Sequence, residues 1–207
     1  MTNLQTSTSP LLPYDPPLGQ PQPARQSELI AQFRSNAEAV QAVVRGAADA
    51  QAICDHAVDL TLAQAGTTIA VVGFDAELVA LLKTTAAPHG IAILDGPLRD
   101  DLTGIHTALT PAQWGIAATG TLVLQSLGED LRIATMLCQS HVCVLDATTI
   151  RAEMEDLVEL LDAALKEDAA YLACITGPSR TADIERVLSI GVHGPQHLHI
   201  LITAGMK

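Results

Sequence analysis

Aromatic side chains and positive charges are both scarce in this sequence of 207 residues. Phe, Trp and Tyr make up only 2% of the chain, so few rings are present on which the bases of a single-stranded nucleic acid could stack. Lys and Arg number 11 against 23 Asp and Glu, which gives a formal net charge of −12. Because proteins bind nucleic acids and anionic membranes through many Lys and Arg, this composition argues against both partners. A small anion held by one or two arginines stays possible.

Closely spaced cysteines are absent as well. The four cysteines form no CxxC motif, so we predict no zinc or iron–sulfur cluster in this chain. Each one lies in an apolar context, which is typical of a buried, reduced thiol. No apolar run approaches the length of a membrane span, and Met1 leads into polar, Pro-rich sequence rather than a signal peptide. We therefore expect a cytoplasmic protein.

Proline divides the chain into two parts. Residues 1–26 contain six of the eleven prolines and are predicted to form a flexible, extended arm. Residues 27–207 are predicted to form a single α/β domain, because hydrophobic residues make up 48% of the chain and suffice for a sizeable core. Within this domain, residues 27–66 are expected to be helical.

Hydrophobic periodicity predicts alternating strands and helices along the domain. A short β-branched run, a helix with an apolar face and a second apolar run form a βαβ unit, which favours a parallel sheet. We expect a Rossmann-like, three-layer α/β/α sandwich with a mostly parallel sheet. The predicted helices are 27–46, 49–66, 75–90, 149–166 and 181–189, and the predicted strands are 67–72, 91–94, 115–118, 122–125, 141–145, 171–175 and 198–202.

A Thr-Gly-Thr turn is the first candidate binding element. Thr119, Gly120 and Thr121 separate two predicted strands, and such a turn presents two hydroxyls and several backbone amides to a carboxylate or phosphate. The structural alternative is a tight connection in which Gly120 only provides an unusual backbone conformation.

A second candidate follows the predicted strand 171–175. Ser179, Arg180 and Thr181 stand where a strand leads into a predicted helix, which is where α/β sheets bind ligands. Arg180 can bind a carboxylate or phosphate through two parallel hydrogen bonds, and Asp183 is the acidic residue best placed to join it. The alternative is an ordinary capped helix with a surface ion pair.

Histidine is the third feature. His193 lies between two glycines and is the better acid/base candidate, although a packed, hydrogen-bonded histidine fits equally well. His197 and His199 share one face of a predicted strand, and a metal would need a third ligand such as His141. A metal-dependent hydrolase built on His193, His197 and His199 is therefore the weakest hypothesis, and we predict no metal. Because no GxSxG, P-loop or GxGxxG motif occurs, hydrolase, NTPase and dehydrogenase folds lack sequence support.

Several of these segments together resemble the lactate utilization protein C family, whose members carry a LUD domain. The similarity covers the chain from about residue 66 to its end and includes ITGPSRTADIE at 175–185, GVHGP at 191–195, LHI at 198–200, ATGTLV at 118–123 and HV at 141–142. The family often has an acidic residue where this chain has Ala118. A proline common before the strand histidine is replaced here by Cys138-Gln139-Ser140.

The resemblance implies a fold similar to the NagB/RpiA/CoA-transferase group and a role in oxidising L-lactate to pyruvate. It implies a cluster-free subunit of an iron–sulfur L-lactate dehydrogenase complex, with iron–sulfur clusters only in the partner proteins. Whether the chain itself is catalytic stays open. The alternative is a stand-alone enzyme acting on acyl, CoA or phosphorylated ligands, although Glu129 and Glu185, the glutamates beside the motifs, match no nucleophile pattern.

The candidate site residues follow from these motifs taken together. The catalytic candidates are His193 and Asp183, and the candidates for binding a small anion are Thr119, Gly120, Thr121, His141, Ser179, Arg180 and Thr181.

Overall fold

The computed structural model describes residues 23–101, 104–126, 128–166, 171–182, 188–190 and 194–204. Most of the predicted arm, residues 1–22, lies outside these residues. Helix α1 begins at Pro23, four residues before the predicted domain boundary, and Pro is well suited to the first turn of a helix. Among the described residues, no helix is both long and apolar enough to cross a membrane.

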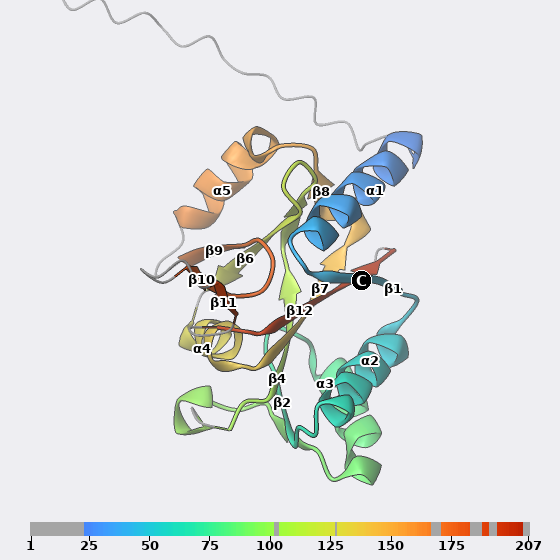
Figure 1. Ribbon diagram of the computed structural model, residues 1–207, viewed down its shortest axis with the longest axis vertical. Helices are drawn as coiled ribbons and strands as arrows, with labels where there is room; N and C mark the ends of the chain where they lie inside the picture. Colours follow the sequence, from blue (N-terminus) through green and yellow to red (C-terminus); the bar gives the residue numbers. More distant parts are fainter. Residues whose placement is uncertain are drawn as a thin grey trace, which may run out of the picture.

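A parallel sheet of six strands forms the centre of the fold (Figure 1). Every neighbouring pair in it is parallel, which confirms the predicted α/β class with a mostly parallel sheet. In spatial order the strands are β1 (Val43–Ala47), β12 (His197–Thr203), β7 (Ser140–Asp146), β4 (Thr107–Ala112), β2 (Thr68–Val71) and β3 (Ala92–Leu94).

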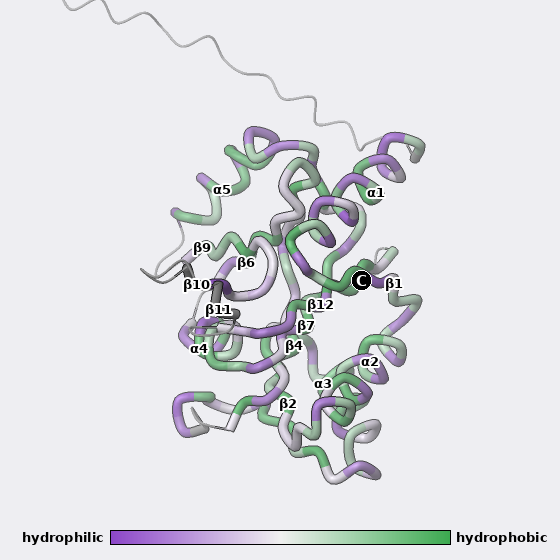
Figure 2. Tube along the Cα trace, viewed as in Figure 1, coloured by the Kyte–Doolittle hydropathy of each residue, from purple (hydrophilic) through white to green (hydrophobic). Residues whose placement is uncertain are grey.

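Helices α2 (Ala50–Ala63) and α3 (Ala76–Ala86) cover one face of this sheet, at the lower right of Figure 1. Both begin at the predicted aspartates. The Asp49 side chain accepts a hydrogen bond from the Ala52 amide, and the Asp75 side chain accepts one from the Leu78 amide, each at 2.8 Å. Each aspartate thus caps its helix by binding a first-turn N–H group that has no partner within the helix. The helices bury aliphatic side chains against the sheet, which Figure 2 shows as green segments at its centre.

The opposite face of the sheet is covered by three elements, which are α1 (Pro23–Ala39), α4 (Glu129–Leu137) and a smaller sheet. Phe33 of α1 is completely buried in the core on this side. The smaller sheet has the order β8 (Ile150–Arg151), β5 (Trp114–Ile116), β6 (Thr121–Ser126) and β9 (Tyr171–Ile175). Helix α5 (Val158–Leu165) packs on its outer face through a cluster that includes Leu157 and Val123.

The remaining elements are short. They are the 3-10 turns η1 (Ala87–His89), η2 (Leu98–Asp101), η3 (Ala147–Thr149) and η4 (Met154–Leu157), and the antiparallel strands β10 (Arg180–Ala182) and β11 (Leu188–Ile190).

Three predicted helices are wrong in part or in whole. Val43 and Val44 belong to strand β1 rather than to the first helix, because the chain turns at Gln41, whose φ is 70°. The helix predicted over 149–166 is shortened to α5, since Ile150 and Arg151 pair with β5. The helix predicted over 181–189 is wrong at both ends, because residues 180–182 and 188–190 pair as strands and Thr181 lies within one of them; residues 183–187 lie outside the described residues.

Strand β4 and helix α4 were not predicted from the sequence. Strand β4 contains Pro111, which cannot donate to a ladder and weakens the strand signal of its neighbours. Helix α4 is only nine residues long and begins without a side-chain cap at Gly128. Both elements are held by burial against the rest of the fold rather than by local sequence.

Candidate functional site

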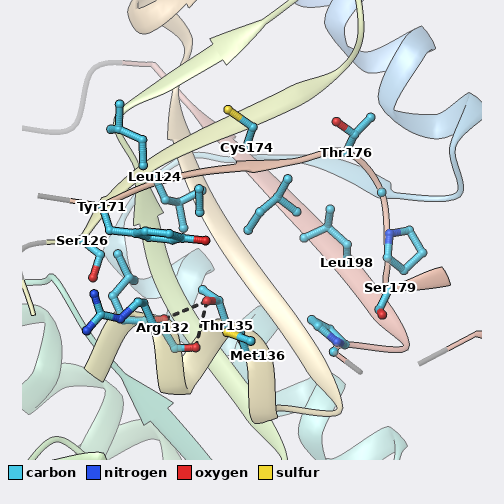
Figure 3. A pocket seen from close by; sticks show the side chains of 18 of the residues that line it. Leu124, Ser126, Arg132, Thr135, Met136, Tyr171, Cys174, Thr176, Ser179 and Leu198 are labelled. Atoms are coloured by element: carbon cyan, nitrogen blue, oxygen red, sulfur yellow. Dashed lines mark hydrogen bonds between the residues drawn. The ribbon is translucent and has the colours of Figure 1, made fainter. Parts of the chain in front are cut away.

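A cavity of about 470 Å³ lies between strand β9 and helix α4 (Figure 3). Its walls are β9 with the turn that follows it, the exposed side of α4, and Gly194 and Pro195 just before β12. Leu198 of β12 and Leu124 of β6 contribute from the two sheets. Ser179 and Arg180, two of the three residues of this motif predicted to bind a ligand, therefore lie on one side of the cavity.

The described residues that line this cavity carry positive charge. They include Arg132 and Arg180, and none of the described lining residues is an Asp or a Glu. The Arg132 guanidinium lies 5.8 Å from the centre of the Tyr171 ring, close enough for a cation–π interaction. The Arg180 side chain is exposed and donates one hydrogen bond to the Val40 carbonyl, which leaves other guanidinium N–H groups for a ligand.

A chain of threonine hydroxyls connects the Thr-Gly-Thr turn to the cavity wall. The hydroxyl oxygens of Thr119 and Thr121 are 2.6 Å apart, and those of Thr121 and Thr176 are 2.8 Å apart. Thr176 lines the cavity, whereas Thr119, Gly120 and Thr121 do not. The turn therefore positions a lining residue instead of contacting the cavity directly.

The last turns of α1 fix this turn in place. The Asn36 side-chain amide donates to the carbonyls of Ala117 and Ala118 at 2.8 and 3.0 Å. Gly120 has a φ of 63°, and a Cβ there would overlap the backbone of Ala37. The glycine is required both by its backbone conformation and by this close approach.

The second motif is held against the same end of α1. Gly177 has a φ of 74°, and a Cβ there would meet the Val40 carbonyl oxygen, which Arg180 also contacts. The Ser179 amide donates to the Pro195 carbonyl at 2.9 Å, which ties the motif to the segment before β12. Two separate sequence motifs therefore meet at the end of α1.

The predicted residues fall into three groups. Ser179 and Arg180 line the cavity. Thr181 belongs to β10, and His193 and Asp183 lie outside the described residues. Ala118 packs against the cluster under α5 and does not line the cavity.

His141 is buried inside the fold and is not a cavity residue. Its side chain is completely buried, and its Nε2 lies 2.8 Å from the Thr110 hydroxyl. Burial lowers the pKa of His141 to about 4, so the ring is neutral at pH 7. Its Nδ1 has no hydrogen-bond partner among the described residues.

The other strand histidines lie on the opposite face of the large sheet. In the strand register His141 pairs with Leu198 and His199 with Val142, so His141 and His199 project to opposite faces. The His199 Nδ1 lies 3.0 Å from the Nε2 of His56 in α2, and burial followed by the charge of His56 lowers the pKa of His199 to about 4. His141 therefore cannot complete a metal site with His197 and His199, and the described residues contain no group of three His, Cys, Asp or Glu able to hold a metal.

The cysteines follow the expectation with one exception. Cys54, Cys138 and Cys143 are buried, and burial raises the pKa of each thiol. Cys174 in β9 is exposed, which corrects the prediction that all four are buried. Cys174 lies in the last strand of the smaller sheet.

Sequence reasoning missed the α4 side of the cavity. Arg132, Thr135 and Tyr171 line it, yet none belongs to a motif that the sequence singled out. Arg132 lies in the helix that was not predicted. The positive charge of Arg132 was the one signal that the sequence offered, since an arginine in an acidic protein is a reasonable candidate for binding an anion.

A second cavity, of about 500 Å³, lies at the carboxyl ends of β2 and β3. Lys83 and Asp95 line it and form an ion pair at 2.7 Å. Asp130 also lines it and accepts a hydrogen bond from the Leu98 amide. The neighbouring Glu129, one of the two glutamates considered as a nucleophile, is hydrogen-bonded to Arg99, which holds the pKa of its carboxyl below the usual range.

Comparison with known proteins assigns the fold and the family. The sequence profile of the LUD domain matches residues 30–203, so the chain belongs to the LUD domain family. The crystal structure of a DUF162 family protein from Deinococcus radiodurans superposes with a TM-score of 0.61 at 20% identity, covering 86% of this chain and 98% of that one. This similarity supports the same fold.

Three curated relatives share about a third of their aligned residues with the chain. An uncharacterized protein of Neisseria meningitidis is 37% identical over 48% of this chain and 42% of its own length. Proteins named lactate utilization protein C from Deinococcus radiodurans and Geobacillus kaustophilus are each 32% identical, over 49% and 42% of this chain and 48% and 38% of their own lengths. The aligned region thus spans less than half of each relative.

Replacing Gly120 by alanine tests the contact between the Thr-Gly-Thr turn and α1. We expect Gly120→Ala to lower the free energy of unfolding by roughly 2 to 4 kcal/mol, because it adds backbone strain and a clash with Ala37. Chemical denaturation measures this change. Gly128→Ala is the matched control, since a Cβ there meets open space, and a loss at Gly120 no larger than at Gly128 would contradict the account.

Acidification tests the buried histidines. The folded-state pKa values of His141 and His199 lie near 4, below the ordinary value of 6.5, so the unfolded chain binds more protons between these limits. The free energy of unfolding should therefore fall as the pH drops from 6.5 to 4, by roughly 1 to 2 kcal/mol per histidine at pH 5. Chemical denaturation of the wild type and of His141→Asn at pH 7.5 and at pH 5 measures this change. If the free energy of unfolding falls equally steeply in the variant, His141 does not contribute to the loss.

Proposed function

We propose that this chain acts in lactate utilization, as a subunit without its own redox cofactor in a cytoplasmic system that oxidises L-lactate to pyruvate. The observation that carries the proposal is the cavity beside β9, which two arginines line in a chain of net charge −12, with no carboxylate among the described lining residues. Both lactate and pyruvate are small carboxylates. The names of the Deinococcus and Geobacillus relatives support this choice of substrate class.

The carboxylate binds at the end of the cavity formed by the second motif. Arg180 supplies a charged, planar donor group, and Ser179 lines the same wall. The hydroxyl of Thr176 points away from Ser179 in Figure 3 and lies 2.8 Å from that of Thr121, so it holds the wall in place. In an otherwise acidic protein, this cluster is a local site to which an anion is attracted.

The electron-transfer chemistry belongs to partner proteins that carry iron–sulfur clusters. Oxidation of lactate requires a group that accepts electrons or hydride, and side chains alone do not provide one. Three of the four cysteines here are buried at separate points with raised thiol pKa values, which does not suit them to ligate a cluster as thiolates. This chain therefore binds the carboxylate or the partner subunits, while its partners hold the clusters.

Removal of the Arg180 charge tests the proposal. Arg180→Gln keeps a donor for the Val40 carbonyl but loses the charge, so affinity for L-lactate should fall at least tenfold while the fold is retained. Isothermal titration calorimetry with L-lactate and pyruvate measures this loss. Arg25→Gln is the control, because Arg25 is an exposed residue of α1 outside the cavity.

Growth provides the second arm of this test. A strain lacking the gene should fail to grow on L-lactate, and the wild-type chain but not Arg180→Gln should restore growth. Normal growth of the deletion strain on L-lactate, or equal binding of L-lactate by both variants and the wild type, would overturn the proposal.

A further inference from the structure

The outer edge of strand β9 lies beside the cavity. The strand is the last one of the smaller sheet and pairs antiparallel with β6 along its inner edge. Within the part of the chain that the structure describes, no strand pairs with the outer edge. Because alternate residues of a strand direct their N–H and C=O groups to opposite edges, this edge carries backbone donors and acceptors that no described strand uses.

The cavity follows this edge along its whole length. Every residue from 171 to 180 lines it, and the opposite wall is the side of α4 that carries Leu131, Arg132 and Met136. In Figure 3, Tyr171 and Arg132 lie at one end, whereas Thr176 and Ser179 lie at the other. The cavity is therefore a groove between a strand edge and a helix, which is the shape that an extended peptide occupies.

Lactate does not account for the Arg132 end of the groove. A ligand of six heavy atoms held by Arg180 fills only a small part of about 470 Å³. The rim of the Arg132 end is unusually apolar for a surface, since Met136 is 59% exposed, Tyr171 49% and Leu137 47%. Tyr, Met and Arg are the residues that protein interfaces favour.

We propose that this groove binds an extended, acidic segment of a partner protein, which adds to the outer edge of β9 as a fifth strand of the smaller sheet. The backbone of the segment pairs with β9, an apolar side chain packs on Met136 and Leu131, and a carboxylate meets Arg132. The inference rests on the proposed role as a subunit and names the kind of contact through which a partner is held.

Charge and space both favour such a partner over a second copy of this chain. Pairing two β9 edges would bring the arginines of both grooves together, and like charges facing each other destabilise an interface. The α4 wall would also face the α4 of the second copy. A single extended strand with a carboxylate meets neither obstacle.

A displayed library of random heptapeptides, selected on the purified full-length chain, tests the proposal. The enriched peptides should contain Asp or Glu, and a synthetic copy of the best one should slow hydrogen exchange of the amides in residues 171–175. Arg132→Glu should weaken its binding at least tenfold, whereas Arg25→Glu, an exposed charge reversal outside the groove, should change it less than twofold. Two further peptides carry N-methyl groups on the odd-numbered or on the even-numbered amides. One of the two should bind at least tenfold more weakly, because methylation removes the N–H donors that pair with β9.

The proposal is overturned if no peptide is enriched, if Arg132→Glu and Arg25→Glu bind it equally, or if neither methylated register loses affinity. These results are separable from the lactate test. Loss of L-lactate affinity in Arg180→Gln without peptide binding would keep the proposed function and reject the groove. If the chain binds the peptide but is not needed for growth on L-lactate, the groove is kept and the proposed function is rejected.

Discussion

The contact between the last turns of α1 and two glycine-containing turns is the constraint on which the site depends. Gly120 approaches the backbone of Ala37 in α1, and Gly177 that of Val40 just after the helix, so closely that neither position has room for a side chain. Arg180 then donates to the Val40 carbonyl just beyond the end of the same helix. These contacts determine where β6 and β9 lie and hence where the cavity opens. Residues that look like ligand-binding groups in the sequence therefore serve in part to hold the backbone.

Electrostatics gives this arrangement its selectivity. A chain of net charge −12 repels small anions over most of its surface, but the described lining of the cavity contains two arginines and no carboxylate. The other cavity carries Asp95 and Asp130 and has the opposite character. An anion that approaches the protein is thus favoured at one of these two places. The same charge pattern suits both a free carboxylate near Arg180 and a carboxylate side chain near Arg132.

The sequence predicted the elements whose signals are local. The helices capped by Asp49 and Asp75, the parallel pairing of β2 with β3, and the strands β6, β7, β9 and β12 all follow from capping residues and apolar runs. It failed where tertiary packing overrides local preference. Val43 and Val44 extend a helical pattern but pair with β12, and the segment after Gly177 contains helix-like spacing but forms a strand pair.

The same division applies to the site: residues that are adjacent in the chain were predicted, and those that only the fold brings together were not. The motif around Arg180 was found because its residues are adjacent in the chain, and the resemblance to the LUD family rests on the same segment. Arg132 and Tyr171 were not found, since only the fold brings α4 beside β9. His141 was predicted to bind the ligand because its burial cannot be read from one sequence. The structure instead buries its side chain completely and places it within hydrogen-bond distance of the Thr110 hydroxyl.

A crystal structure of the full chain grown with L-lactate or pyruvate is the most direct test of this account. It should show the carboxylate of the ligand on the guanidinium of Arg180, within reach of the Ser179 hydroxyl, with the turns at Gly120 and Gly177 unmoved against the end of α1. A ligand bound instead at the carboxyl ends of β2 and β3, beside Lys83, would contradict it.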